Sequence, residues 1–210
     1  MPGEALRVGG LTPMTTIDFP GHLAAVVFCQ GCPMRCHYCH NPELLPRRND
    51  NQPSWKAILE FLSARIGLLD GVVFSGGEPT LQRSIGQAVR DIKSMGYRVG
   101  LHTAGIYPER FEQLLPLIDW VGLDIKALAE DYPALTGARR SGESAWRSAR
   151  LLAASGVPHE IRTTLFPAID NSGYRNRLRG ELMALGKINH KWQTYRHLPQ
   201  EHLLQQVSLS

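Results

Sequence analysis

The chain has 210 residues, of which 43% are hydrophobic and 20% charged, a balance typical of a globular protein rather than a disordered one. Lys and Arg outnumber Asp and Glu by 23 to 19, a surplus too small to indicate nucleic-acid binding. No apolar run approaches the roughly 20 residues of a transmembrane helix, and no leader resembling a secretion signal is present.

We therefore expect a cytoplasmic protein with a single domain over residues 1–210, its core over about 8–196 and a polar tail over 197–210. Short apolar runs predict strands at 23–29, 71–74, 97–102, 120–125, 159–165 and 191–195. Helical periodicity between them predicts helices at 54–66, 81–95, 109–117, 142–154 and 173–185. This alternation is typical of a mainly parallel α/β sheet with right-handed crossovers.

Two predicted connections are longer than usual, at 29–53 and 128–143. Connections of this length are uncommon unless they carry a function. The second contains the basic pair Arg139 and Arg140, which suggests a docking rim for a partner or, equally, a solvated loop.

All four cysteines, Cys29, Cys32, Cys36 and Cys39, lie in the first of these connections. Such clustering indicates a metal site rather than a disulfide framework, and soft thiolates select zinc or iron–sulfur. The run does not match the ferredoxin spacing C-x2-C-x2-C-x3-C.

The cysteine loop alone is consistent with two kinds of metal site. Four cysteines, or three with His37 or His40, could form a closed structural zinc site. Alternatively, Cys32, Cys36 and Cys39 could hold a four-iron cluster with one iron left open for a substrate. In that case Cys29 is a buried free thiol.

A second motif follows the next predicted strand, where Gly76, Gly77 and Glu78 precede Pro79. The glycines let a ligand approach the backbone, and Glu78 offers an acceptor for an ammonium group. Alone, the motif is best interpreted as a tight strand-to-helix turn. Together with the cysteine loop it favours the open cluster.

The pattern C-x3-C-x2-C followed by GGE resembles the radical S-adenosylmethionine superfamily. The segments 10–21 and 39–43 are similar to activating proteins of glycyl-radical enzymes, most of all to the anaerobic ribonucleoside-triphosphate reductase activating type. The resemblance covers residues 8–196 and implies a partial (β/α)6 TIM-type barrel, mostly parallel, with outer helices.

The resemblance also implies the chemistry. Cys32, Cys36 and Cys39 would bind a [4Fe–4S] cluster, and S-adenosylmethionine would chelate the fourth iron. One-electron reduction would cleave S-adenosylmethionine, and the resulting radical would take a hydrogen atom from a glycine of a partner glycyl-radical enzyme. No cysteine remains for a second cluster, so flavodoxin or ferredoxin is the expected electron donor.

The resemblance further assigns cofactor-binding residues. Gly76, Gly77 and Glu78 match the element that holds the methionine ammonium, and Tyr38 the aromatic position near the adenine. The remaining candidates are Thr103, Asp124, Lys126 and Arg162. Charges at strand ends are common in α/β folds, so Lys126 and Arg162 could equally be solvated. His102 replaces an aspartate of pyruvate formate-lyase activases, which weakens any monovalent cation site there.

Three other functions remain open. The first is a pyruvate formate-lyase-type activase, and the second a small-molecule radical enzyme similar to 7-carboxy-7-deazaguanine synthase. The third is not an enzyme but a zinc-stabilised α/β binding module.

Overall fold

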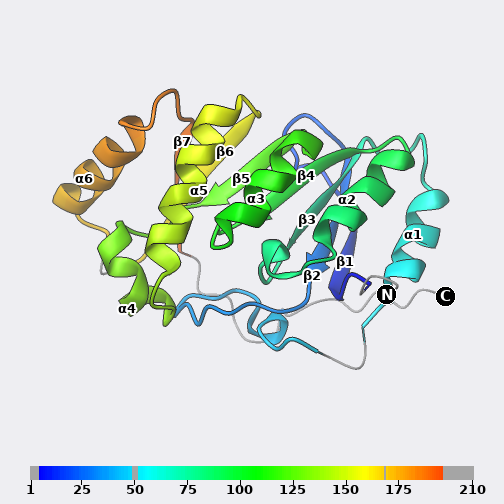
Figure 1. Ribbon diagram of the computed structural model, residues 1–210, viewed down its shortest axis with the longest axis horizontal. Helices are drawn as coiled ribbons and strands as arrows, with labels where there is room; N and C mark the ends of the chain where they lie inside the picture. The colour runs from blue at the N-terminus through cyan, green and yellow to red at the C-terminus, as the bar shows by residue number, and fades with distance from the viewer. Residues whose placement is uncertain (1–4, 49–51, 168, 196–210) are drawn as a thin grey trace.

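A seven-stranded sheet in simple sequence order, from β1 to β7, forms the centre of the protein. The computed structural model describes residues 5–48, 52–167 and 169–195, so the predicted tail at 197–210 lies outside the described residues. Figure 1 shows the sheet fanning from β1 to β7, with α1, α2, α3 and α5 packed along one face. No helix in these described ranges is long and apolar enough to span a membrane.

The strands are β1 (Val8–Thr15), β2 (Ala24–Cys29), β3 (Gly71–Gly76), β4 (Arg98–Thr103), β5 (Trp120–Asp124), β6 (His159–Leu165) and β7 (His190–Thr194). The α-helices are α1 (Trp55–Ser63), α2 (Ile85–Ser94), α3 (Pro108–Leu114), α4 (Tyr132–Thr136), α5 (Ser141–Ser155) and α6 (Ser172–Met183). Short 3-10 helices are η1 (Pro42–Leu44), η2 (Pro79–Leu81), η3 (Leu115–Leu117) and η4 (Ala129–Asp131).

The predicted fold class is confirmed, because β2 to β7 are parallel and each is joined to the next through helices. All six predicted strands and all five predicted helices are present, β6 over its predicted range and the others with shifted ends. Parallel strands end at one edge of the sheet, and α/β proteins place their sites there.

The sequence prediction missed β1, which pairs antiparallel with β2. Gly9, Gly10 and Pro13 weaken its strand signal, and two register shifts interrupt the pairing. Proline is tolerated at a sheet edge because its missing N–H faces no partner strand. The sheet therefore has one more strand than the six that were expected.

The two faces of the sheet carry separate cores because strand residues alternate between them. On β3, Val72 and Phe74 join the large core beneath the helices, whereas Val73 joins a smaller cluster on the opposite face. That second cluster contains Phe19 from the β1–β2 connection and Trp120 from β5, with ring centroids 6.1 Å apart. An aromatic pair thus covers part of the inner face of the open barrel.

Helix ends agree with their sequence signals. The Ser54 side chain caps α1 by accepting a hydrogen bond from the Ala57 amide. Gly96 follows α2 with φ of 88°, and Gly156 ends α5 with φ of 73°, the left-handed conformation that glycine adopts freely.

The predicted connection 128–143 is a packed segment rather than an open loop. It contains η4 and α4, and α5 already begins at Ser141. Tyr132 is fully buried within it, and the Thr136 carbonyl accepts a hydrogen bond from the Arg35 amide of the cysteine loop at 2.7 Å. Arg139 and Arg140 are exposed. A helix of five residues ended by Gly137 is too short to give a periodic signal.

Candidate functional site

The cysteine loop begins where β2 ends at Cys29. Its first residues, 30–32, are hydrogen-bonded to the later segment 43–46 of the same loop. The Gly31 amide donates to the Leu44 carbonyl at 2.8 Å, and the Cys32 amide donates to that of Leu45 at 3.1 Å. Gln30 spans the same gap, because its side-chain amide donates to the Glu43 and Pro46 carbonyls. These contacts close the loop over the carboxyl edge of the sheet.

The glycine motif is hydrogen-bonded directly to the cysteine loop. The Gly77 amide donates to the Cys29 carbonyl and the Glu78 amide to that of Gly31, both at 3.0 Å. Gly76 has φ of 106°, and a Cβ on Gly77 would lie 2.4 Å from the Gly31 oxygen. Both glycines are therefore required by the backbone, one for its conformation and the other for the close approach.

Glu78 lies in a different environment from the one expected from the sequence, where its carboxylate was to accept a hydrogen bond from a ligand's ammonium group. Its side chain is fully buried, where one carboxylate oxygen accepts from the Thr80 amide, the Thr80 hydroxyl and the Thr103 hydroxyl. The other accepts from the Ala104 amide at 2.9 Å. The expected acceptor for an ammonium group is thus already engaged by protein donors, and it joins the ends of β3 and β4.

A cavity of about 230 Å³ lies at this edge of the sheet. Its lining includes the predicted residues Cys32, Cys36, Cys39, Tyr38, Gly76, Gly77, Thr103, Asp124, Lys126 and Arg162, but not Glu78. They come from the cysteine loop and from the ends of β3, β4, β5 and β6. The fold therefore brings together every candidate except Glu78, which acts through its neighbours.

The three motif thiols face this cavity, and Cys32 also packs in a small apolar cluster with Met34 and Ala104. Burial raises the pKa of Cys32 to about 12. Burial also raises the pKa of Cys36, although the nearby Lys126 acts in the opposite direction. Among the described residues, no three His, Cys, Asp or Glu side chains form a group that could hold a metal ion. Cys29 is a fully buried free thiol outside the cavity lining.

The chemistry of the donors around the cavity, rather than their arrangement in this structure, fits an iron–sulfur cluster with a bound organic ligand. Three thiols are soft ligands of the kind that hold such clusters, and binding them would release their protons. The Tyr38 hydroxyl is buried without a hydrogen-bond partner among the described residues, so a ligand in the cavity could supply the missing partner.

Charged groups line the other side of the cavity. Asp124 and Arg162 are opposite each other in the β5–β6 register, and the Arg162 Nε donates to the Asp124 carboxylate at 3.0 Å. Lys126 Nζ lies 4.0 Å from the same carboxylate and 5.7 Å from the centre of the Tyr38 ring. The Lys126 and Arg162 side chains are each only 13% exposed, so they are not ordinary solvated charges.

The pKa values in this group follow from that crowding. Burial acts to raise the pKa of Asp124, but Arg162 and Lys126 outweigh it and the net shift is downward. Burial acts to lower the pKa of Lys126, but Tyr38, Asp124 and Cys36 make the net shift upward. Two cations and one carboxylate thus leave a net positive charge facing the cavity, which suits an anionic ligand group.

His102 also lines the cavity. Its Nε2 lies 2.9 Å from the Asp18 carbonyl, and since a carbonyl only accepts, this nitrogen carries the proton. Burial, with a smaller contribution from Arg162, lowers the pKa of His102 to about 4. The side chain is therefore neutral near pH 7.

Some contributing residues were missed from the sequence. Thr164 and Gln193 line the cavity from β6 and β7, and Thr164 could have been found because it lies two residues after Arg162 on the same strand face. Tyr132 could not, since it acts from α4. Its hydroxyl accepts a hydrogen bond from the Lys126 amide at 2.8 Å and so fixes the start of the connection after β5.

Comparison with known proteins identifies the family. The model of the radical SAM superfamily matches residues 26–174. A Methanocaldococcus jannaschii protein named as a glycyl-radical enzyme activating enzyme is 33% identical over 171 residues, covering 77% of this chain and 69% of its own length. The pyruvate formate-lyase-activating enzyme of Streptococcus mutans is 35% identical over 182 residues, covering 78% and 68%.

Solved structures agree on the fold. Streptococcus suis SuiB bound to S-adenosylmethionine superposes with a TM-score of 0.64 at 18% identity, over 81% of this chain and 40% of SuiB. Members of the superfamily use a [4Fe–4S] cluster together with S-adenosylmethionine. The three thiols around one cavity, the fold and the sequence relatives agree, and the chain belongs to the radical SAM superfamily, in its group of glycyl-radical enzyme activating enzymes.

Proposed function

We propose that this protein installs a glycyl radical on anaerobic ribonucleoside-triphosphate reductase. One observation carries the proposal: the three motif thiols, the Gly76–Gly77 backbone and the cations Lys126 and Arg162 all line the same cavity. Such a cavity can hold a cluster at one end and the amino-acid part of S-adenosylmethionine at the other. The N-terminal segments 10–21 and 39–43 support the choice of partner.

The residues divide the binding work by chemistry. Cys32, Cys36 and Cys39 would hold the cluster through their thiolates. The backbone at Gly76 and Gly77 would face the ammonium group, and Lys126 with Arg162 would bind the carboxylate. When bound, the cluster and S-adenosylmethionine supply a one-electron cleavage that yields a radical able to take a hydrogen atom from carbon.

The remaining residues keep these groups in place. The hydrogen bond between Glu78 and Thr103 connects the end of β3 to the end of β4. The Tyr132 hydroxyl accepts a hydrogen bond from the Lys126 amide and so holds the backbone after β5 in place. The neutral His102 and the buried Tyr38 ring limit water beside the ligand. Rigid support of this kind is what a reactive intermediate requires, since it must meet its substrate before it meets solvent.

The open sheet supports a protein rather than a small molecule as substrate. β1 and β7 stand at opposite ends of the strand order, and the described strands do not pair them with each other. The side of the barrel between them is therefore not closed by hydrogen bonds, and a peptide loop can reach the inner face.

A reconstitution experiment tests the proposal. The protein would be loaded anaerobically with iron and sulfide, and its electron paramagnetic resonance spectrum recorded with and without S-adenosylmethionine. It would then be mixed with anaerobic ribonucleotide reductase, and the glycyl-radical signal counted per partner chain. A perturbed cluster spectrum followed by a glycyl radical supports the proposal, whereas a colourless protein holding one zinc contradicts it.

Pyruvate formate-lyase is the second candidate partner, and the 35% identity to the Streptococcus mutans activating enzyme favours it. The same assay separates the two. A glycyl radical on pyruvate formate-lyase and none on the reductase would assign the protein to the second partner.

A further inference from the structure

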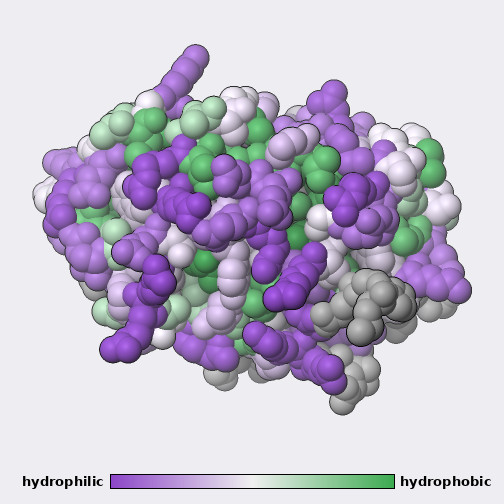
Figure 2. All heavy atoms as spheres, viewed as in Figure 1, coloured by the Kyte–Doolittle hydropathy of each residue, from purple (hydrophilic) through white to green (hydrophobic). Residues whose placement is uncertain are grey.

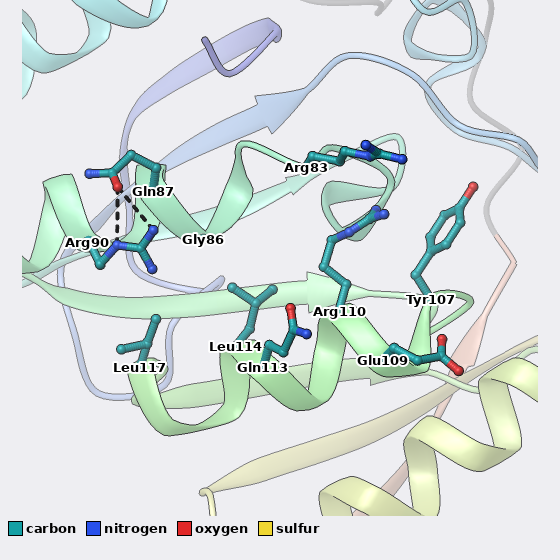
Figure 3. A pocket seen from close by; sticks show the side chains of 10 residues that line it. All are labelled: Arg83, Gly86, Gln87, Arg90, Tyr107, Glu109, Arg110, Gln113, Leu114 and Leu117. Carbon is teal, nitrogen blue, oxygen red and sulfur yellow. Dashed lines mark hydrogen bonds between the residues drawn. The ribbon is translucent and has the colours of Figure 1, made fainter. Parts of the chain in front are cut away.

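A groove between α2 and α3 lies outside the site described above and has a volume of about 490 Å³. We call it the arginine groove, because Arg83, Arg90 and Arg110 line it together with Tyr107 and Glu109. Figure 3 shows Arg83, which precedes α2, and Arg110 of α3 side by side, both extending toward the end of the groove where Tyr107 lies. Figure 2 shows hydrophilic side chains spread over the face that carries these helices.

The arginines of this groove are not neutralised. In the described ranges, no carboxylate forms an ion pair with Arg83, Arg90 or Arg110. Arg90 donates to the neutral Gln87 side chain at 3.0 and 3.2 Å. The carboxylate lining the groove, Glu109, pairs instead with Arg147 at 2.5 Å. Three arginines and one carboxylate that is already paired with Arg147 leave the groove with a net positive charge, which attracts an acidic partner.

One end of the groove is connected to the cluster-binding loop. Arg110 donates to the Thr80 carbonyl, and Thr80 donates through its amide and hydroxyl to Glu78. Glu78 accepts from the Ala104 amide, and Ala104 packs in one cluster with Cys32. A continuous path of hydrogen bonds and contacts therefore leads from the groove to a cluster ligand.

The proposed chemistry needs an electron that the chain cannot store. All four cysteines of the sequence lie between residues 29 and 39, so no second iron–sulfur cluster can relay electrons within these 210 residues. The cluster must receive one electron from a separate carrier, and that carrier must dock close to the cysteine loop.

We propose that the arginine groove is the docking surface for an acidic one-electron carrier protein. The inference rests on the proposed function. In the transfer the carrier loses one electron and the cluster gains it, passing from the 2+ to the 1+ state, and no bond or proton is exchanged. Attraction between the arginines and carboxylates of the carrier speeds encounter and weakens with salt.

Charge reversal tests the proposal, with an acidic flavodoxin as the probe. The groove variant is Arg83→Glu with Arg90→Glu, and Arg110 is kept because it supports the Thr80 turn. The matched control is Arg98→Glu with Arg150→Glu, two exposed arginines outside the groove. Binding of oxidised flavodoxin is measured by surface plasmon resonance, without the cluster, at low and high salt. Reduction of the reconstituted cluster is then timed with reduced flavodoxin and, separately, with photoreduced deazaflavin.

We expect the groove variant to lose flavodoxin affinity and reduction rate by about tenfold or more at low salt, while the control variant stays near wild type. The deazaflavin rate should be equal in all three proteins. An equal loss of flavodoxin affinity and reduction rate in the control variant, or no loss in the groove variant, would contradict the proposal that the arginine groove is the docking surface. If deazaflavin reduces the wild-type cluster but S-adenosylmethionine is not cleaved, the proposed function fails instead, independently of the groove.

Discussion

The carboxylate of Glu78 and the hydroxyl of Thr103 are joined by a hydrogen bond of 2.6 Å where both side chains are buried. The bond connects the turn after β3 to the end of β4 and leaves no Glu78 oxygen without a protein donor. The geometry of the glycine motif thus depends on a residue that does not line the cavity itself.

Glu78→Gln should destabilise the protein by about 1–3 kcal/mol, because the new amide nitrogen would face the backbone N–H of either Thr80 or Ala104 and leave that buried donor unsatisfied. Urea denaturation of the two proteins would measure the loss. Glu112→Gln on α3 removes the same charge at an exposed position and should change stability by no more than about 0.5 kcal/mol. Equal stability of Glu78→Gln and wild type would show that these hydrogen bonds do not matter.

Gly77→Ala should displace the cysteine loop, because the added Cβ would lie 2.4 Å from the Gly31 oxygen and 3.0 Å from the Leu44 oxygen. Both are backbone atoms, which cannot move aside cheaply. The expected result is a lower iron content after reconstitution together with reduced stability. Gly180→Ala adds the same methyl group in α6, where nothing lies within 4 Å, and should be neutral or stabilising by up to about 1 kcal/mol. Full iron loading of Gly77→Ala would contradict the prediction.

The cysteines should separate into two classes when each is changed to alanine. Loss of Cys32, Cys36 or Cys39 should abolish cluster binding, since each thiol faces the cavity. Cys29→Ala should retain the iron and the colour, because that thiol is fully buried outside the cavity lining. Iron and sulfide analysis after anaerobic reconstitution would distinguish the classes. Loss of the cluster in Cys29→Ala, with the fold intact by circular dichroism, would indicate a four-cysteine site.

Acid should destabilise the protein through two buried histidines. Burial is the main cause that lowers the pKa of His102 and of His190 to about 4, with contributions from Arg162 and Arg179 respectively. The unfolded value is about 6.5, so the unfolded chain takes up protons first. Stability is therefore complete above about pH 6.5 and is lost as the pH falls toward 4.

At pH 5 His102 should account for about 2 kcal/mol of lost stability, and the less deeply enclosed His190 for less. Urea unfolding between pH 7 and pH 5 measures the slope. His102→Gln and His190→Gln should each make that slope shallower, because glutamine takes up no proton. The same slope in both variants and the wild type would show that other groups cause the acid sensitivity.

Much of the fold could be predicted from the sequence, because the patterns that mark strands and helix ends lie within a few neighbouring residues. Strands β2, β3 and β5 each carry their own apolar run, and helix ends such as those at Ser54 and Gly156 carry their own caps. Exceptions arose where local signals were weak. β1 contains Gly9, Gly10 and Pro13, and its extended conformation is stabilised by pairing with β2. α4 is held by the burial of Tyr132 rather than by periodicity.

The sequence also determined the donor types, because C-x3-C-x2-C and the two glycines are contiguous patterns that need no distant partner to be recognised. Only the tertiary structure decided which groups meet. Asp124 and Arg162 face each other through the β5–β6 register. The Glu78 carboxylate accepts hydrogen bonds from two separate segments of the chain. Arg83, before α2, and Arg110, in α3, line the same groove. The physical reason is that contacts between residues distant in sequence follow from strand pairing and helix packing, which no local pattern records.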